Sequence, residues 1–262
     1  MGTITKALEM LNFFSRHRPE LGLSEFVKLT RRDKATVLRH LSELKENGFI
    51  EQAPNSRAYR LGPAILRLAS VSEAIYPLRD RVRPIINEIA QQVGELTHVT
   101  LVQGDALSPL MYSDVKIHGT QVNYNEGELL PLHATSSGMA VLAFAESSFV
   151  DQVLAKGLQP FSSRTITDPA QLRERLAEIR DSGFAYQEKY FDNEVTSEGA
   201  PIFGASGEVI GAVSIVIPSI RQSDEKLADI RRRLCEAVVR ITEAFGGSLP
   251  PEHAYKWHCL SN

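Results

Sequence analysis

The 262-residue chain is poor in cysteine and in long apolar runs, and each scarcity excludes a class of protein. Its two cysteines, Cys235 and Cys259, set up no disulfide framework of the kind that stabilises small secreted domains. No apolar run approaches the ~20 residues of a membrane-spanning helix, and the first residues lack the apolar core of a signal peptide. We therefore expect a reduced, cytoplasmic protein with no membrane segment.

Short motifs that bind nucleotide phosphates or metal ions are also missing. The chain has no G-x-G-x-x-G and no G-x-x-x-x-G-K-S/T, and the small residues at 136–140 lack the lysine of a phosphate loop. Its seven histidines are scattered, and His253, His258 and Cys259 do not have the spacing of a metal site. The sequence predicts no metal, no cofactor and no catalytic residue.

Charge is unevenly distributed although the net charge is only −3. Residues 1–62 contain 11 Lys and Arg against 7 Asp and Glu, whereas the remainder contains 18 against 25. A basic part joined to an acidic part indicates that the first contacts a polyanion and the second does not. Together with the chain length, this predicts domains at 1–62 and 79–247, a linker helix at 63–78 and a flexible tail at 248–262.

Three helices are predicted in the basic part. A helix over 5–16 is followed by a second with Ser24 as its N-cap, and by a third between the cap Asp33 and the stop Gly48. The third helix is expected to bury one stripe of apolar residues, namely Val37, Leu38, Leu41 and Leu44.

Two short strands at 49–54 and 58–62 follow the helices and form a β-wing, so the order is that of a winged helix-turn-helix. The exposed side of the third helix is expected to lie in the major groove of DNA. The alternative is a three-helix protein-interaction module with solvated basic residues. The predicted phosphate contacts are Arg31, Arg32 and Lys34, the predicted base contacts are Thr36, Arg39 and His40, and Arg57 at the wing tip reaches the minor groove.

The linker helix starts near Pro63, a residue favoured in the first helical turn. A contact between two copies of the chain is its expected further role, and the alternative is packing against its own chain alone. The residues that we expect it to bury are Ile65, Leu66, Leu68, Ala69 and Ile75.

The acidic part mixes strand and helix signals. A hairpin pattern at 97–115 is followed by helices after Pro131 and after the cap Asp168, then by three strand-like runs within 184–218 and a closing helix from Asp224. This predicts an α+β domain with an antiparallel sheet and helices on its faces.

Polar residues inside the apolar strands are the candidates for a ligand site. Ser197 and Ser214 lie on strands predicted to be neighbours, and the helix start at 134–138 adds N–H groups suited to a carboxylate. The alternative is that each serine bonds to backbone in the core. Glu194 and Glu198 are interpreted as solvated charges rather than as a catalytic pair.

Two stretches make the chain resemble the IclR family of bacterial transcription regulators. They are LPLHATSSGMAVLA at 130–143 and GFAYQEKYFDNEVTSEGAPIFGASGEVIGAVSIVIP at 183–218, and the resemblance covers residues 3–247. It implies an N-terminal winged helix-turn-helix, a linker helix that pairs protomers and a C-terminal GAF-like effector domain. Members of the family act as homodimers or homotetramers on palindromic double-stranded DNA operators, often those of catabolic operons.

The resemblance also implies effector contacts. Ser197 occupies the place of a family Cys or Ser, Ser214 matches a serine on the next strand, and Ser136 and Ser137 match the small residues before the helix glycine, Gly138.

Four positions depart from the family pattern. Gln187, which is also a predicted effector contact, stands where an aspartate is common, and Val216 replaces a second strand serine. Met139 replaces a Lys or Arg, and Glu194 a glycine.

The sequence therefore predicts a transcription regulator, acting as repressor or activator, in which a small organic acid alters the spacing or mobility of paired winged helices. One alternative is an effector-independent DNA-binding or scaffold protein. The other is an enzyme, for which Ser197 and Ser214 lack a histidine base in the same motif.

Overall fold

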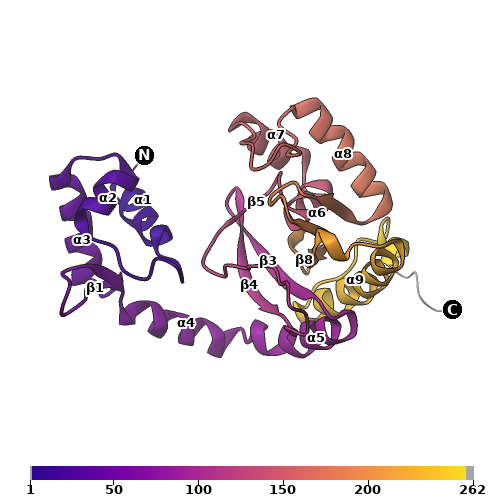
Figure 1. Cartoon of the computed structure of the whole chain (residues 1–262), viewed down its shortest axis with the longest axis horizontal. Helices are drawn as coiled ribbons and strands as arrows, with labels where there is room; N and C mark the ends of the chain where they lie inside the picture. Colours follow the sequence, from indigo (N-terminus) through magenta and orange to yellow (C-terminus); the bar gives the residue numbers. More distant parts are fainter. Residues whose placement is uncertain (1, 258–262) are drawn as a thin grey trace. The chain divides into compact units, whose positions relative to one another are not determined.

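The chain folds as two compact units in a computed structural model that describes residues 2–257 (Figure 1). The first unit runs to Pro77 and includes Asn125–Glu128, and the second consists of Leu78–Tyr124 and the chain from Leu129. Three helices, a two-stranded antiparallel wing and one further helix make up the first unit. Its elements are α1 (Thr3–Leu8), η1 (Glu9–Phe13), α2 (Leu23–Thr30), α3 (Lys34–Glu46), β1 (Ile50–Gln52), β2 (Tyr59–Leu61) and α4 (Pro63–Ile75).

Helix boundaries follow the local signals in α3 and differ from them earlier in the chain. The Asp33 carboxylate accepts a hydrogen bond from the Thr36 N–H at 2.8 Å, as predicted for the cap of α3. The predicted helix over 5–16 is wrong in extent, because the chain tightens into the 3-10 helix η1 after Leu8. The predicted cap at Ser24 is also wrong. Gly22 precedes α2, and its N–H donates to the Glu25 carboxylate at 2.8 Å.

Aromatic packing around Phe26 holds the first unit together. Phe26 is fully buried, and its ring lies 5.7 Å from that of Phe14 and 6.2 Å from that of Tyr59, so η1, α2 and the wing meet at one point. Leu38 was predicted to be buried, but it is 42% exposed. The apolar stripe of α3 that packs with Phe26 lies on a different side of the helix.

The linker helix α4 does not bury its apolar residues within this chain. The predicted burial of its apolar residues is therefore wrong, and the reason is that no other element of the unit covers this face in the described residues. Of the predicted residues Leu66, Leu68, Ala69 and Ile75 are exposed and Ile65 is half-buried, and Val71 and the following Tyr76 are exposed as well.

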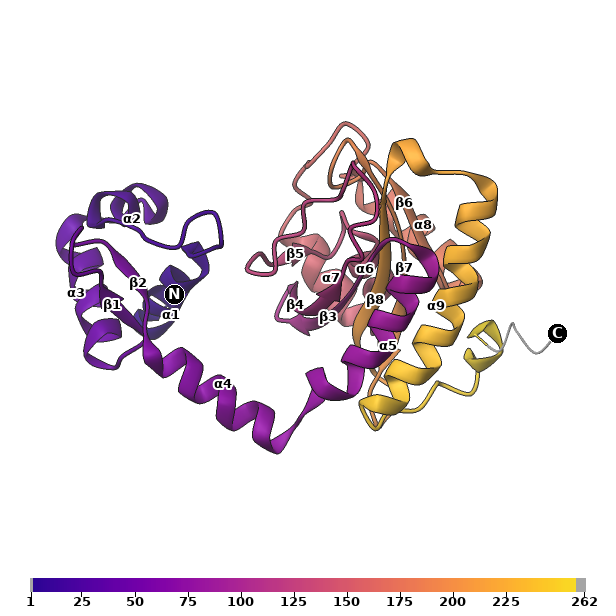
Figure 2. The same ribbon diagram turned by 60° about the horizontal axis from the view of Figure 1, so that its bottom comes forward.

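The second unit is an antiparallel six-stranded sheet with helices on both faces, in the order β5-β4-β3-β8-β7-β6 (Figure 2). The predicted α+β class is confirmed. Its strands are β3 (Leu96–Gln103), β4 (Ala106–Ser113), β5 (Leu130–Pro131), β6 (Ala185–Glu188), β7 (Val195–Phe203) and β8 (Val209–Pro218). Its helices are α5 (Leu78–Val93), α6 (Ser136–Phe144), α7 (Ser147–Ala155), α8 (Pro169–Ser182), η2 (Ser219–Arg221), α9 (Asp224–Ala244) and η3 (Ala254–Trp257).

Alternation along the strands separates the two faces of the sheet. Val213, Ile215 and Ile217 of β8 pack in one apolar cluster with α5 and α9. Ala212 packs in a second cluster with α6 and α8, so Ser214 and Val216, at the same parity, face α6. We call this second side of the sheet the α6 face.

Two glycines let α6 approach the sheet. A Cβ on Gly199 would lie 2.5 Å from the Ser214 Oγ and 2.8 Å from the Ser136 backbone, and one on Gly138 would lie 2.2 Å from the Leu132 carbonyl oxygen. Contacts this short exclude any side chain. The N-terminus of α6 therefore lies directly on β7 and β8.

Among residues 2–257 no helix combines the length and apolarity needed to cross a bilayer. The predicted loose tail is wrong as far as Trp257. The Trp257 side chain is 2% exposed, and its ring lies 5.5 Å from that of Phe203. The prediction fails because η3 brings the large Trp257 ring against the domain, where burying it is favourable.

Candidate functional site

The outer face of α3 is basic at its start. Lys34 and Arg39 are exposed, and Thr36 is half-buried. Arg31 ends α2 with φ = 53°, and Arg57 takes φ = 54° in the wing turn, so both basic side chains project from tight backbone corners. These five residues, which the sequence predicts to contact DNA, lie at the end of α2, on the outer side of α3 and in the wing turn.

Arg32 and His40, also predicted to contact DNA, point into the unit instead. The Arg32 guanidinium pairs with the Glu9 carboxylate at 2.7 Å and donates to the Lys6 carbonyl at 3.1 Å, which ties the turn to the first helix. This pairing arises because the Glu9 carboxylate of η1 reaches the turn between α2 and α3.

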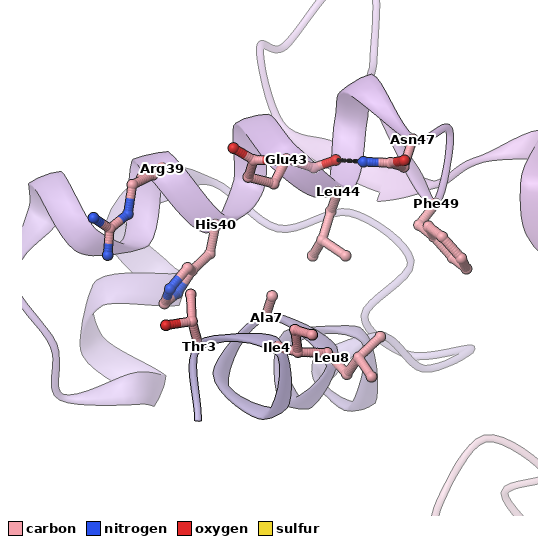
Figure 3. A pocket seen from close by; sticks show the side chains of 10 residues that line it. All are labelled: Thr3, Ile4, Ala7, Leu8, Arg39, His40, Glu43, Leu44, Asn47 and Phe49. Carbon is pink, nitrogen blue, oxygen red and sulfur yellow. Dashed lines mark hydrogen bonds between the residues drawn. The ribbon is translucent and has the colours of Figure 1, made fainter. Parts of the chain in front are cut away.

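His40 is 2% exposed and faces α1, lining a groove of about 460 Å³ between α1 and α3 (Figure 3). Burial, with a smaller contribution from the Arg39 charge, lowers the pKa of His40. Its ring is covered by α1, whose position the helical pattern of α3 does not reveal. His40 is therefore not a base-contacting residue.

The strand register brings the predicted effector residues of the second unit onto the α6 face. Ser197 of β7 pairs with Gln187 of β6 and with Val216 of β8. Ser214 pairs with Gly199 on one side and with His98 on the other. Residues far apart in sequence thus form two adjacent polar rows across four strands.

Three serines make a compact hydroxyl cluster where α6 meets the sheet. The Ser214 Oγ lies 2.8 Å from the Ser137 Oγ and 3.1 Å from the Ser136 Oγ, and all three side chains are at most 2% exposed. Thr135 caps α6 by accepting a hydrogen bond from the Gly138 N–H at 3.1 Å. The N–H groups of Ser136 and Ser137 precede the first intrahelical bond of α6, that of Met139 to Thr135.

Gln187 is the unusual member of the site. Its side chain is 3% exposed, and both its amide oxygen and its amide nitrogen are buried without a hydrogen-bond partner among residues 2–257. Neighbouring Ser197 is half-buried. A buried amide with no partner is costly unless another molecule supplies the hydrogen bonds.

His98, Tyr112 and Tyr124 belong to the same face and were missed from the sequence. The Tyr124 hydroxyl lies 3.2 Å from the His98 Nδ1, and the Tyr124 ring is 4.8 Å from that of His98 and 5.2 Å from that of Tyr112. Burial lowers the pKa of His98 to about 3, so the imidazole is neutral near pH 7. The alternation in 97–115 was the only signal, and it did not identify a face.

Glu198 was interpreted as a solvated charge, and that interpretation is wrong. Its side chain is fully buried on the opposite face of the sheet, where the Arg231 Nε of α9 donates to it at 3.0 Å. Burial raises the pKa of this carboxyl, and the Arg231 bond and charge oppose the shift. Glu194 is exposed, as predicted.

The α6 face carries no serine–histidine pair among the contacts of the described residues. His98 is opposite Ser214 in register, but the Ser214 hydroxyl bonds to Ser136 and Ser137 while the His98 Nδ1 bonds to Tyr124. Within residues 2–257 no three His, Cys, Asp or Glu side chains are grouped to hold a metal ion. His258 and Cys259 lie outside the described residues.

Comparisons with known proteins match both units. The family model for the C-terminal domain of the bacterial transcriptional regulator IclR covers residues 74–243, and that for the IclR helix-turn-helix domain covers 3–54. The transcriptional regulator BhcR of Paracoccus denitrificans is 30% identical over 246 residues, which are 91% of this chain and 85% of that protein.

Solved structures agree with these matches. A protein from Silicibacter sp. TM1040, assigned as an IclR transcriptional regulator, has a TM-score of 0.87 and 42% identity, with 96% of this chain and 99% of that chain covered. An IclR homologue from Microbacterium hydrocarbonoxydans, solved in complex with 4-hydroxybenzoate, has a TM-score of 0.74 and 25% identity, with coverage of 94% and 100%.

Proposed function

The chain belongs to the IclR family of bacterial transcription regulators, and from this premise we propose that it controls a catabolic operon in response to a small organic acid. The second unit binds the acid on its α6 face, and the first unit binds a double-stranded DNA operator in the cytoplasm. The acid alters operator affinity by favouring one of two arrangements of the paired DNA-binding units.

The observation that carries the proposal is the buried, unpartnered amide of Gln187 beside Ser197. An amide can donate to one oxygen of a ligand and accept from a hydroxyl. A neutral Gln187, unlike a carboxylate, does not repel an anion. Binding of an acid here would remove the cost of two unpaired buried groups.

The ligand's carboxylate has a matching partner at the N-terminus of α6. The N–H groups of Ser136 and Ser137 and the positive end of the helix dipole favour an anion, and the hydroxyls, Ser214 included, add hydrogen bonds. The rings of Tyr112 and Tyr124 form an aromatic wall beside this point. The 4-hydroxybenzoate held by the Microbacterium homologue is an acid that such a wall and cluster suit.

The DNA contacts that we propose follow the exposed basic residues. Arg31, Lys34 and Arg57 neutralise phosphates, and Arg39 reads guanine in the major groove with Thr36 beside it. Arg32 and His40 support the surface from inside and do not touch DNA.

A second copy of the chain is needed to cover α4. Leu66, Leu68, Val71, Ile75 and Tyr76 of this helix and its end are between 44% and 75% exposed, and apolar side chains gathered on one element mark a protein interface. We propose that α4 pairs protomers, as a homodimer or within a homotetramer, so that two winged helices meet a palindromic operator.

Thermal shift against a panel of carboxylic acids that includes 4-hydroxybenzoate tests the effector. An acid present at a hundred times its dissociation constant stabilises the protein by about 2.7 kcal/mol. Gln187→Leu should abolish the shift, whereas Gln152→Leu, the same change at an exposed position of α7, should leave it intact.

Genome-wide binding of the protein then identifies the operator, and the enzymes encoded beside it should consume the acid that gives the shift. A flat panel, or an equal shift in the Gln187→Leu variant, would remove the α6 face as the effector site. Turnover of a bound acid by the protein would favour the enzyme alternative.

A further inference from the structure

The segment that joins β4 to β5 is unusually long. Residues 114–129 contain no helix or strand. Connections longer than about 12 to 15 residues without secondary structure are uncommon, and ordered ones are usually functional loops such as lids. We call the part from Asp114 to Tyr124, which belongs to the second unit, the strap.

The last residue of the strap lies on the α6 face. Tyr124 contacts His98 through its hydroxyl, 3.2 Å from the Nδ1, and its ring contacts the rings of His98 and Tyr112, two residues of this face. His98 is 4% exposed. The strap is therefore part of what separates the site from solvent.

The middle of the strap covers the neighbouring end of the same face. Val216 pairs in register with Ser197 and with Leu96, so all three share a row. A cavity of only about 10 Å³ remains between the strap and Leu96 and Val216, room for a single water at most. The strap residues that line this cavity are Asp114, Lys116, Ile117, His118, Gln121 and Val122.

One arginine fastens the strap to the domain. The Arg221 Nη1 donates to the Thr120 carbonyl at 2.6 Å, while the Nε and Nη2 donate to the two Glu95 carboxylate oxygens at 2.9 and 2.6 Å. Glu95 begins the turn into β3 and is 2% exposed. The planar guanidinium pairs its Nε and Nη2 with the two carboxylate oxygens and points its Nη1 at the carbonyl, a fixed fork that the single nitrogen of an ammonium lacks.

The turn that carries Arg221 is held by hydrogen bonds to β7 and to the residue just before it. The Ser219 N–H donates to the Glu194 carbonyl at 2.7 Å, and the Thr196 hydroxyl bonds to the Ser219 Oγ and the Gln222 Oε1, both at 2.9 Å. Arg221 therefore extends from a turn, η2, that is held by several hydrogen bonds, and its partner Thr120 lies in a segment without helix or strand.

Two further basic side chains lie near the Glu95 carboxylate. The Lys226 Nζ lies 3.5 Å from it and the His118 Nε2, on the strap itself, 3.8 Å. Lys226 keeps a charge beside Glu95 if Arg221 is replaced, so the loss of Arg221 does not leave the carboxylate without a cation.

We propose that Arg221 is a positioning residue for the effector site: by joining Glu95 to the Thr120 carbonyl it holds the strap, and Tyr124 with it, closed over the α6 face. The proposal deepens the proposed function, on which it rests for the meaning of that face. Release of the strap gives the acid its route in, and re-formation of the Arg221 bonds retains it.

The strap can be tested without any effector. Diethyl pyrocarbonate carbethoxylates neutral imidazole, and mass spectrometry of the full-length protein gives the rate at each histidine. Because burial lowers the pKa of His98 to about 3, its ring is neutral at pH 7 and reacts whenever the strap exposes it. His17, which is exposed, supplies the unprotected rate, and His133, buried elsewhere in the second unit, reports global unfolding.

In the wild-type protein His98 should react far more slowly than His17. Arg221→Ala should accelerate the reaction of His98 by at least about tenfold and leave His133 unchanged, because the charge-assisted bond to Thr120 is lost. Arg221→Lys keeps the charge beside Glu95 but not the fork, and should give an intermediate rate. Arg173→Ala, which removes an exposed ion pair with Asp151, should match the wild type.

The outcomes separate the strap from the effector. Equal His98 rates in wild type and Arg221→Ala would overturn the proposal, as would equal acceleration of His98 and His133 in both Arg221 variants. A selective rise at His98 would uphold it even if no carboxylic acid binds, so its failure and that of the proposed function are distinguishable.

Discussion

The outer face of α3 and the α6 face of the sheet both gather polar side chains, but they present them in opposite ways. Lys34 and Arg39 carry full charges into solvent, where water and salt weaken every interaction until DNA displaces them. Gln187 and Ser214 are neutral and buried, where each hydrogen bond has geometric demands and an unmade one is costly. A polyanion of variable sequence suits the first surface, and one small molecule of fixed shape suits the second.

The largest expected effect is on the buried α6 face, at Gly199. Gly199→Ala places a Cβ 2.5 Å from the Ser214 Oγ and 2.8 Å from the α6 backbone, and should lower the free energy of unfolding by about 3 kcal/mol. Gly119→Ala is the control, because an added Cβ there meets nothing within 4 Å. Denaturant unfolding measures both, and a Gly199→Ala protein as stable as the control would contradict the packing of α6 on the sheet.

Acid should destabilise the second unit through His98. Burial lowers its pKa from 6.5 to about 3, so between these values the unfolded chain binds a proton that the folded protein does not. This contribution to stability is complete above about pH 6.5 and is lost progressively as the pH falls towards 3. Thermal unfolding at several pH values should show a shallower acid loss in His98→Gln. An identical pH profile would mean that His98 does not remain neutral and buried.

Arg39 and His40, adjacent in α3, should have opposite properties. Arg39→Ala should weaken operator binding by about 1 to 3 kcal/mol and relax preference at one base pair. His40→Leu should preserve base preference, since both ring nitrogens are buried without a partner and face α1. Binding to an operator library measures both variants, and a change of preference in His40→Leu alone would reverse the assignment.

The smallest expected effect is on salt dependence. Lys34→Ala should reduce the slope of log affinity against log salt by about one, without a change in base preference. Binding of an acid to the neutral α6 face should change little over the same salt range. A Lys34→Ala slope equal to that of the wild type would show that this lysine neutralises no phosphate.

Local signals predicted the elements well because their causes are local. Asp33 caps α3 and Asp168 caps α8 through side-chain bonds to N–H groups three residues on, and Gly183 ends α8 with φ = 86°, a conformation that costs glycine little. The same reasoning failed at Ser24, because the Gly22 N–H donates to the Glu25 side chain and the helix begins before Ser24.

Burial was predicted less well than helix, because a helical pattern shows which residues share a face and not what covers it. Leu38 was expected to be buried and is exposed, whereas His40 was expected to be exposed and is buried, because α1 lies over His40. The α4 residues are exposed for the same reason, as a single chain does not supply their partner.

The effector residues show how far a resemblance extends beyond local pattern. Ser214 was chosen as a polar interruption in an apolar strand, and its cluster with Ser136 and Ser137 lies within the predicted set. His98 and Tyr124 were not found, because their proximity depends on strand register and on the path of the strap. Neither has a signature in the sequence.

Helix α6 has no side facing solvent, for its residues from Ser136 to Ala143 are all buried. Close-packed interiors are nearly incompressible, so a displacement at its N-terminus cannot be absorbed by loose side chains. A molecule bound at Ser136 would therefore be expected to displace α6 as a whole, together with α8, which packs against it.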